Sequence, residues 1–245
     1  WEDIEFAFGG SKDGGAADTM VGKLGLTGLQ FINVANGCAT GGSALFSACN
    51  SIKAGMFDLG IAVGFDKHER GAFRIDLQSH GLEEWYGESG LALTTQFFGM
   101  KLNRYMHDYG ITEPTLAKVA EKAFRNGSKN PMAWRRRPMS EAEIADSAML
   151  SYPLTQYMFC SPGEGGVALV LCRADKAKNY TDTPIYLKSA VVRSRRFGSF
   201  EVMAPHLAPE RTDGPTVAAS TAAFEMAGMG PDDIDLAQLQ DTEVG

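Results

Sequence analysis

The sequence predicts an α/β fold organised around a parallel sheet, and three segments carry this prediction. Leu29–Ala35 is a nearly continuous apolar run, as expected for a strand that is buried on both faces. Thr40–Lys53 consists of small and helix-compatible residues, and Leu59–Phe65 is a second apolar run. Because strand, helix and strand follow one another in this order, the two strands are predicted to lie parallel in one sheet.

The composition is that of a globular protein. The chain has 245 residues, of which 44% are hydrophobic and 22% are charged, enough for one large core or two smaller ones. The net charge of −7 and the isoelectric point near 5.2 argue against nucleic-acid binding, which usually requires a basic surface. No apolar run approaches the roughly 20 residues that span a bilayer, so no membrane span is predicted.

The four cysteines indicate a cytoplasmic protein. They lack the paired spacing of zinc ligands, and they are too few for a disulfide framework in a chain of this length. Cys49, Cys160 and Cys172 lie among apolar or small residues and are interpreted as buried thiols. Cys38 is the exception, because it lies next to glycines where a strand turns into a helix. The histidines show no metal-like spacing either, and no metal site is predicted.

Further strands flank the first unit. Ile4–Gly10 is a short apolar segment closed by glycines, which predicts an N-terminal strand. Gly165–Leu171 predicts another strand, which we expect to be a buried neighbour of Leu29–Ala35 and Leu59–Phe65 in one sheet. Pro184–Val192 predicts the start of a second sheet.

Residues 66–152 differ in character and predict a helical insertion between sheet elements. Gln96–Gly110 and Pro114–Gly127 are amphipathic, and the second segment begins at a proline and ends at a glycine, as helices often do. Ser140–Glu143 fits a capping box at the start of a third helix.

The end of the chain repeats the plan of an earlier segment. Ser220–Leu239 has a helix of small residues, a glycine, an aspartate and then a strand, in the same order as residues 43–63. We therefore predict two similar halves, residues 1–182 and 183–245, of which the second is truncated. The chain is accordingly interpreted as an internal fragment of a longer protein.

Three segments resemble the thiolase superfamily. Asn33–Lys67, with the sequence NVANGCATGGSALFSACNSIKAGMFDLGIAVGFDK, resembles the strand–helix–strand unit that bears the thiolase nucleophile. Tyr152–Leu171 resembles the segment that closes the N-terminal half, and Tyr105–Asn130 resembles the sterol-carrier-protein thiolases. The resemblance implies a layered α-β-α-β-α thiolase fold with two pseudo-duplicated halves, a homodimer and acyl-CoA substrates. Coenzyme A then enters as part of the substrate, and no bound cofactor is expected.

One departure narrows the resemblance. Gln240 stands where sterol-carrier-type thiolases carry a histidine, and Asp241 follows it. This version, together with Gly64–Arg74, resembles the lipid-transfer-protein branch of steroid-degrading bacteria, whose members act as aldolases. The resemblance then implies retro-aldol cleavage of a steroid side-chain CoA thioester to a 17-ketosteroid and propionyl-CoA. It also implies a small partner protein with an OB-fold.

Cys38 admits two interpretations. A helix N-terminus lowers the pKa of a thiol, so Cys38 is a candidate nucleophile for acyl transfer. Aldol cleavage needs no acyl-enzyme, and Cys38 is then a pocket residue, which is the interpretation we favour narrowly. In either case we expect Cys38 in the first turn of a helix, largely buried at the floor of a pocket. Gly37 is assigned to the backbone geometry of this turn.

The remaining candidates concern the substrate. Trp85 and Tyr86 either shape a steroid pocket or form a dimer contact. Trp134, Arg135 and Arg136 either hold CoA, by stacking on adenine and binding phosphate, or form a solvated charge run.

Two further candidates are placed by the strands predicted near them. Gly165 belongs to Gly163–Gly166, which is interpreted as a turn; the alternative is that the amides of this turn face the thioester. Gln240 and Asp241 follow the predicted strand Ile234–Leu239, and we expect Gln240 to point toward Cys38. Asp241 is either a catalytic base or a turn carboxylate bonded to backbone amides.

Three functions therefore remain open. The first is a carbon–carbon lyase that performs the retro-aldol reaction. The second is a 3-ketoacyl-CoA thiolase that uses Cys38 as nucleophile, and the third is a non-catalytic lipid or acyl-CoA binder of thiolase type. Gln240 weighs against the second because an amide cannot accept a proton as histidine does.

Overall fold

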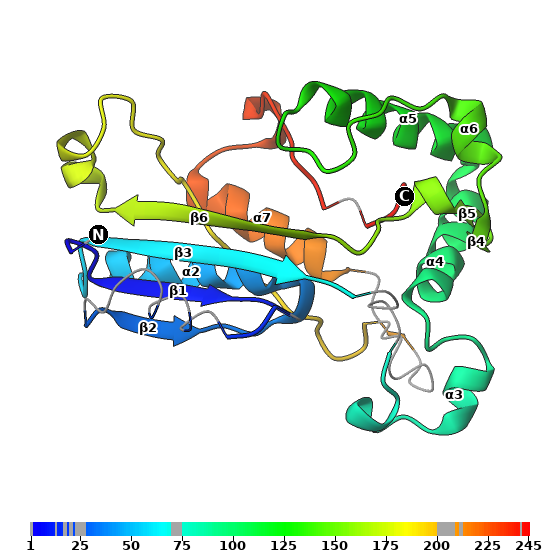
Figure 1. Cartoon of the computed structure of the whole chain (residues 1–245), viewed down its shortest axis with the longest axis horizontal. Coiled ribbons are helices and arrows are strands. Elements are labelled where there is room, and N and C mark those ends of the chain that lie inside the picture. The colour runs from blue at the N-terminus through cyan, green and yellow to red at the C-terminus, as the bar shows by residue number, and fades with distance from the viewer. Residues whose placement is uncertain are drawn as a thin grey trace. The chain divides into compact units, whose positions relative to one another are not determined.

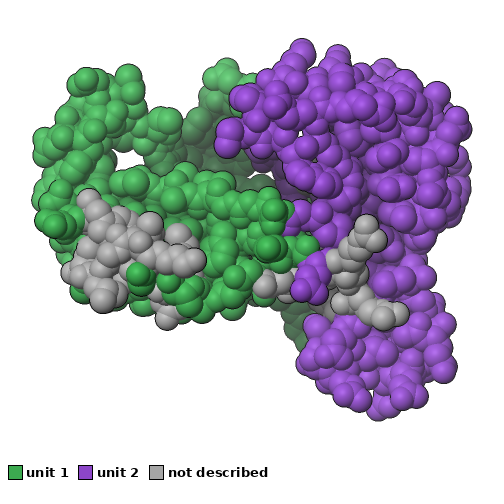
Figure 2. Space-filling view, viewed as in Figure 1, with its two compact units in different colours: residues 1–68, 164–199, 208–236 green, residues 69–163, 200–207, 237–245 purple. Residues whose placement is uncertain are grey.

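The structure is a computed structural model that describes residues 2–12, 14–16, 19, 22, 28–69, 75–199, 209–210, 213–240 and 242–245. The chain divides into two compact units, coloured separately in Figure 2. The sheet unit contains residues 1–68, 164–199 and 208–236, and the helical unit contains residues 69–163, 200–207 and 237–245. The sequence predicts a helical insertion at residues 66–152, and the helical unit contains nearly all of this range. The predicted division into two halves at residue 183 stays a prediction.

The described part of the sheet unit contains one four-stranded sheet, with strand order β2-β1-β3-β6 (Figure 1). The strands are β1 (Phe6–Gly10), β2 (Gln30–Asn33), β3 (Leu59–Lys67) and β6 (Glu164–Cys172). β1 is parallel to both β2 and β3, whereas β3 and β6 are antiparallel. The prediction that the three apolar runs share one sheet is confirmed, although β1 lies between β2 and β3.

One face of this sheet is covered by the helix α2 (Thr40–Lys53), whose bounds are those predicted. Ala44 and Ala48 are fully buried and pack with Phe6, Phe8 and Ala62 of the sheet. Alanines at this face let the helix approach the strands closely, which explains the run of small residues in the sequence. Figure 1 shows α2 lying along the sheet behind β1 and β3.

The predicted burial of the outer strands is wrong. Of the three predicted runs, the one that forms β3 is largely buried, as is β1 beside it, whereas β2 is mostly exposed. Val167, Leu169 and Val170 of β6 are 64%, 46% and 67% exposed. The reason is their position, because β2 and β6 are the two edges of the sheet and α2 packs mainly on β1 and β3. An apolar sequence predicts a strand but not whether something covers it.

Two predicted strands do not form. Pro184–Val192 and Ile234–Leu239 have no strand assignment, and Ile185 is 99% exposed. A strand needs a neighbour to satisfy its backbone groups, and neither segment is paired in a ladder within the described residues. Before the second segment lies α7 (Pro215–Ala227), a helix that ends, as predicted, at a glycine; Gly228 has a φ of +64°.

The helical unit contains the helices α3 to α6 and a small hairpin. Their bounds are α3 (Glu84–Glu88), α4 (Thr94–Tyr109), α5 (Glu113–Lys129), α6 (Glu141–Ala145), β4 (Met149–Ser151) and β5 (Leu154–Thr155). Five short 3-10 turns complete the described elements of the two units: η2 (Gly37–Ala39), η3 (Gln78–His80), η4 (Gln156–Met158), η5 (Ala174–Asn179) and η6 (Pro231–Asp233).

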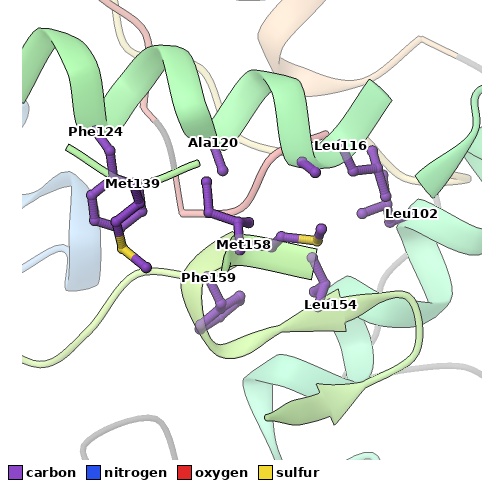
Figure 3. Packing of buried hydrophobic residues seen from close by; sticks show 10 residues of the cluster. Leu102, Leu116, Ala120, Phe124, Met139, Leu154, Met158 and Phe159 are labelled. Atoms are coloured by element: carbon purple, nitrogen blue, oxygen red, sulfur yellow. The ribbon is translucent and has the colours of Figure 1, made fainter. Parts of the chain in front are cut away.

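The core of the helical unit lies between α5 and the segment that follows β5 (Figure 3). Leu116, Ala120 and Phe124 project from α5 at helical spacing, and Met158 and Phe159 pack against this face. The predicted capping box at the start of α6 is confirmed, with reciprocal bonds between Ser140 and Glu143.

The sequence predicts that α5 ends at Gly127, but in the structure the helix continues to Lys129. A Cβ atom on Gly127 would lie 2.8 Å from the carbonyl oxygen of Arg135. This glycine therefore permits a close approach of the segment that carries Arg135, and that approach is the reason for its place inside the helix.

Candidate functional site

The turn that carries Cys38 is fixed by its own backbone. η2 leads directly into α2, and Gly37 has a φ of +52°, which a residue with a side chain rarely adopts. Thr40 is buried, and its hydroxyl donates to the Gly37 carbonyl at 2.7 Å and accepts the Asn36 amide at 2.9 Å. Cys38 is thus held at the start of a helix, as the sequence predicts.

Cys38 itself is exposed, so the expected burial at the floor of a pocket is wrong. The glycines around it provide no side chain that could cover the thiol. Cβ atoms added at Gly37 and Gly42 would meet no atom within 4 Å, so this side of the helix start is open. In the sheet unit the Cys38 turn is an open edge and not a cavity.

The other side of the same turn is tightly packed. The Val34 amide donates to the Gly9 carbonyl at 2.8 Å, which continues the parallel ladder past the end of β2. A Cβ atom on Gly10 would lie 1.9 Å from the Val34 carbonyl oxygen and 2.7 Å from a methyl carbon of Thr40. The glycine at the end of β1 is therefore required for the approach of the Cys38 turn. The carboxyl ends of parallel strands are where such sheets bind ligands.

Gly165 lies at this edge of the sheet as well. It belongs to β6 rather than to the expected turn, and it stands opposite Asp66 of β3 in the antiparallel register. Gly165 is exposed, and a Cβ atom added to it would meet no atom within 4 Å. Of the predicted site residues, Gly37, Cys38 and Gly165 thus belong to the sheet unit.

The helical unit contains a cavity of about 460 Å³ that is lined in part by residues 133–135. Its walls come from α5, from residues 133–135 and 157–161, and from the C-terminal residues Glu243 and Val244. Most of the lining is apolar or aromatic, with Arg135, Ser161 and Glu243 as polar exceptions. Such a composition, mostly apolar with a few polar groups, is typical of ligand pockets.

Arg135 is the cation of this cavity. Its guanidinium donates a hydrogen bond to the Ser161 hydroxyl and lies 5.5 Å from the ring centroids of Phe124 and Trp134 and 5.8 Å from that of Tyr157. Partial burial lowers the pKa of Arg135 below its usual value, because desolvation disfavours the charged form. Among the described residues no carboxylate forms an ion pair with Arg135, so its charge is balanced by aromatic faces and a hydroxyl.

The neighbouring residues of the predicted CoA segment differ from Arg135. Trp134 is 70% exposed, and Arg136 is exposed as well. Arg137 is paired with Glu143 at 3.0 Å and so belongs to the cap of α6. This cap lowers the pKa of Glu143 to about 2, through the Ser140 amide first and Arg137 next. Of the three consecutive arginines, Arg135 alone lines the cavity.

Trp85 and Tyr86 have opposite surroundings. Trp85 is 55% exposed, whereas Tyr86 is 1% exposed and its side chain is part of the packing around α3. Their rings meet edge to face with centroids 5.5 Å apart. Trp85 therefore has a surface on which a ligand or a partner can pack, whereas the side chain of Tyr86 is buried.

Gln240 is exposed, and its side-chain amide donates to the Thr242 hydroxyl at 3.1 Å. It belongs to the helical unit and Cys38 to the sheet unit, so the expected approach of the two side chains stays a prediction. Asp241 lies outside the described residues.

Glu243 is a polar residue of the cavity that the sequence did not indicate. Its side chain is 5% exposed and forms an ion pair with Lys101 of α4. The segment is fixed by a bridge between Phe159 and Glu243 and by a 2.9 Å bond from the Cys160 amide to the Thr242 carbonyl. The partners are more than eighty residues apart, and no local pattern announces such a pairing.

A second cavity, of about 820 Å³, lies in the sheet unit between α2, β6 and residues 184–190. Cys49 and Cys172 line it, and burial raises the pKa of both thiols, which is consistent with inert cysteines. Cys38 does not line either of the two cavities.

Among the described residues, no group of three His, Cys, Asp or Glu side chains is arranged to hold a metal ion. None of the helices that the structure describes has the length and apolar character needed to cross a bilayer.

The comparisons with known proteins agree with this arrangement. The family model "Thiolase, N-terminal domain" matches residues 10–136, about half of the chain. The chain belongs to the thiolase superfamily. Acetyl-CoA acetyltransferase of Methanothermobacter thermautotrophicus is 33% identical over 89% of this chain and 55% of that protein. Sterol carrier protein 2 of Bos taurus is 27% identical over 97% of this chain and 45% of that protein, which supports the sterol-carrier-type branch.

A solved structure shows the same fold. The Ltp2-ChsH2(DUF35) aldolase superposes with a TM-score of 0.78 at 20% identity, over 98% of this chain and 63% of that one. The chain therefore has part of the α/β thiolase fold. It spans about half the length of the curated relatives it matches.

Proposed function

We propose that the protein containing this chain is a carbon–carbon lyase that cleaves a CoA thioester by a retro-aldol reaction. The substrate is a steroid whose side chain carries a 17-hydroxyl group and a CoA thioester, and the products are a 17-ketosteroid and propionyl-CoA. The observation that carries this proposal is Gln240, an exposed neutral amide bonded to Thr242 where sterol-carrier-type thiolases have a histidine. Similarity to the fold of an aldolase supports the same reaction.

The helical unit supplies the recognition of CoA in this proposal. The guanidinium of Arg135 binds a phosphate of CoA through its planar set of donors, for which arginine is well suited. The exposed indole of Trp134 stacks on the adenine ring. CoA is thus bound as part of the substrate, without a resident cofactor.

The reaction takes place at the edge that carries Cys38. A base removes the proton of the 17-hydroxyl group, its oxygen becomes the ketone, and the bond between the α and β carbons breaks. The electron pair of that bond forms the enolate of the thioester, which then takes up a proton at the α carbon. The partial positive charge at the start of α2 stabilises the enolate oxygen, as oriented dipoles do at other developing oxyanions. Cys38 lines this site without forming a bond to the substrate.

A thiolase that uses Cys38 is the second candidate. It is supported by the 33% identity to an acetyl-CoA acetyltransferase and by the exposed position of Cys38 at a helix start. A binder without catalytic activity is the third. By analogy with the relatives we further propose a homodimer in the cytoplasm with a small OB-fold partner, since the aldolase of similar fold is a complex with a DUF35 protein.

Product analysis separates these candidates. The intact protein is incubated with the hydroxylated steroid-CoA thioester without free CoA, and the products are identified by mass spectrometry. The lyase releases ketosteroid and propionyl-CoA under these conditions. A requirement for free CoA together with a 3-ketoacyl substrate would establish the thiolase, and unchanged substrate of either kind would favour the binder.

A further inference from the structure

A histidine and an aspartate are paired at the end of β3. Nε2 of His68 lies 3.5 Å from Oδ2 of Asp66. Asp66 is the penultimate residue of the strand, and His68 follows the strand directly. The two side chains are 23% and 26% exposed, so the pair is partly buried and still accessible from solvent.

The carboxylate of this pair is held by the backbone. Oδ2 of Asp66 accepts the amide of Lys12 at 3.0 Å, and Oδ1 accepts the amide of Lys67 at 3.0 Å. Lys12 belongs to the loop after β1 and Lys67 to β3, so two separate segments fix the orientation of one carboxylate. A carboxylate fixed in this way orients the imidazole ring beside it, as in other aspartate–histidine pairs that transfer protons.

The pair lies beside the Cys38 turn. Side chains alternate along a strand, so Ala62, Gly64 and Asp66 project from the same face of β3. This face is covered by α2, because Ala62 packs in its cluster and a Cβ atom on Gly64 would lie 3.3 Å from the Cα atom of Gly41. Asp66 is two residues, about 6.5 Å, beyond this contact, on the side where α2 begins.

Cys38 lies three residues before Gly41, which is just under one helical turn. Asp66 and Cys38 therefore both lie directly beyond the contact of Gly41 with Gly64, one on the strand and one on the turn. Gly165 of β6 lies opposite Asp66 in the sheet. The edge therefore combines the Cys38 turn, the Asp66–His68 pair at the end of β3, and the start of β6.

We propose that His68, oriented by Asp66, is the general base of the site at the Cys38 turn. This inference rests on the proposed lyase function and supplies the base that Gln240 cannot provide. The imidazole nitrogen that is not directed at Asp66 accepts the hydroxyl proton of the substrate. The oxygen forms the ketone, the bond between the α and β carbons breaks, and its electron pair enters the thioester enolate. The imidazolium returns the proton to the α carbon.

Several titratable side chains lie around the pair. Asp66 and Lys67 belong to β3, Lys12 belongs to the loop after β1, and Cys38 belongs to the turn before α2. Glu164 lies 3.9 Å from Lys67 across the β3–β6 ladder. Acid protonates the imidazole and so removes the base, and the rate of cleavage falls on the acid side of the profile.

Three variants of the intact protein test the proposal. His68→Gln removes the base, Asp66→Asn removes its orienting charge, and His107→Gln is the matched control. His107 also faces an aspartate, Asp108 at 3.2 Å, but it lies on α4 and is 81% exposed. The first readout is kcat/KM for cleavage of the hydroxyacyl-CoA substrate as a function of pH. The second is the rate at which iodoacetamide alkylates Cys38, followed by mass spectrometry of its peptide.

We expect His68→Gln to lower kcat/KM by about 10²- to 10⁴-fold and to abolish its acid limb. Asp66→Asn lowers kcat/KM about tenfold and moves the acid limb, and His107→Gln leaves the profile unchanged. Alkylation of Cys38 near pH 6 slows several-fold in His68→Gln, because a nearby imidazolium favours the thiolate. Circular dichroism verifies that each variant is folded. If His68→Gln does not fold, the pH profile of Asp66→Asn still tests the proposal.

Two results would separate failure of this inference from failure of the proposed function. If His68→Gln cleaves the substrate at the wild-type rate and Cys38 alkylation is unchanged, the inference is wrong and the lyase stands. If the wild type does not cleave the hydroxyacyl-CoA but alkylation of Cys38 depends on His68, the lyase is wrong while the pairing of His68 with the Cys38 edge stands.

Discussion

Cys38 and Arg135 lie in opposite kinds of surroundings. Cys38 is an exposed thiol on an open edge of the sheet unit, with glycines near it in the sequence. Arg135 is a half-buried cation in the helical unit, enclosed by aromatic rings and bonded to Ser161. An open edge gives reacting atoms room to change geometry, whereas an enclosed cation binds an anion strongly because water does not compete. Under the proposed function, the open edge suits the reacting atoms and the enclosed cation suits a phosphate of CoA.

The two units also differ in how their apolar residues are used, and the largest expected effect follows from this. Leu154 is fully buried in the core of the helical unit, whereas Leu169 in β6 is 46% exposed. We expect Leu154→Ala to lower the free energy of unfolding by about 2–5 kcal/mol and Leu169→Ala by less than about 1 kcal/mol. Urea denaturation followed by tryptophan fluorescence measures both. Equal losses would mean that β6 is covered as fully as the helical core.

The second prediction concerns the cation of the cavity. Arg135→Ala removes a charged donor from a partly desolvated site, which is worth about 1.5–3 kcal/mol, so the Kd for CoA should rise about 10- to 100-fold. Arg136→Ala is the matched control, since Arg136 is adjacent but exposed, and it should change the Kd less than about threefold. Calorimetric titration with CoA measures the Kd of both variants and of the wild type. If Arg136→Ala proves the more damaging, recognition lies on the surface and not in the cavity.

A smaller effect is expected at the cap of α6. The pKa of Glu143 is lowered from 4.5 to about 2 in the folded chain, so this group adds stability that is complete above about pH 4.5. The contribution is lost as the pH falls from 4.5 to 2. The stability difference between wild type and Glu143→Gln should therefore shrink over this range, as measured by urea denaturation at several pH values. Glu141→Gln, an exposed residue of the same turn, should show no comparable trend.

The smallest effect is expected at Gln240. This exposed side chain bonds to Thr242 and does not line either cavity, so Gln240→His should increase thiolysis of a 3-ketoacyl-CoA by less than about tenfold. A larger gain in a coupled assay for acyl-CoA release would show that a histidine at this position is sufficient for acyl transfer. Gln240→Asn serves as the control without a proton acceptor.

The local features of the fold could be predicted from the sequence. The bounds of α2, the cap of α6 and the glycine end of α7 each depend on a few consecutive residues, and all three are confirmed. The helix start at Cys38 belongs to the same class, because glycines beside a strand end specify a turn.

The features that failed depend on distant residues. The apolar sequences of β2 and β6 do not reveal that these strands are the edges of the sheet, and Pro184–Val192 does not reveal that it is unpaired in any ladder among the residues that the structure describes. The same holds for the site. Glu243 and Lys101 are 142 residues apart, so their ion pair could not be inferred from spacing. Asp66 and His68 are only two residues apart in the sequence, but this spacing does not show that their side chains meet or that α2 packs on the same face of β3.

The central claim is that this edge breaks a carbon–carbon bond without an acyl-enzyme, and Cys38→Ala tests it most directly. The variant and the wild type are compared for release of propionyl-CoA from the hydroxylated steroid-CoA thioester. Since Cys38 forms no bond to the substrate in a retro-aldol reaction, the variant should keep its rate within about tenfold of the wild type. A loss of three or more orders of magnitude would contradict the account and identify Cys38 as the nucleophile of a thiolase.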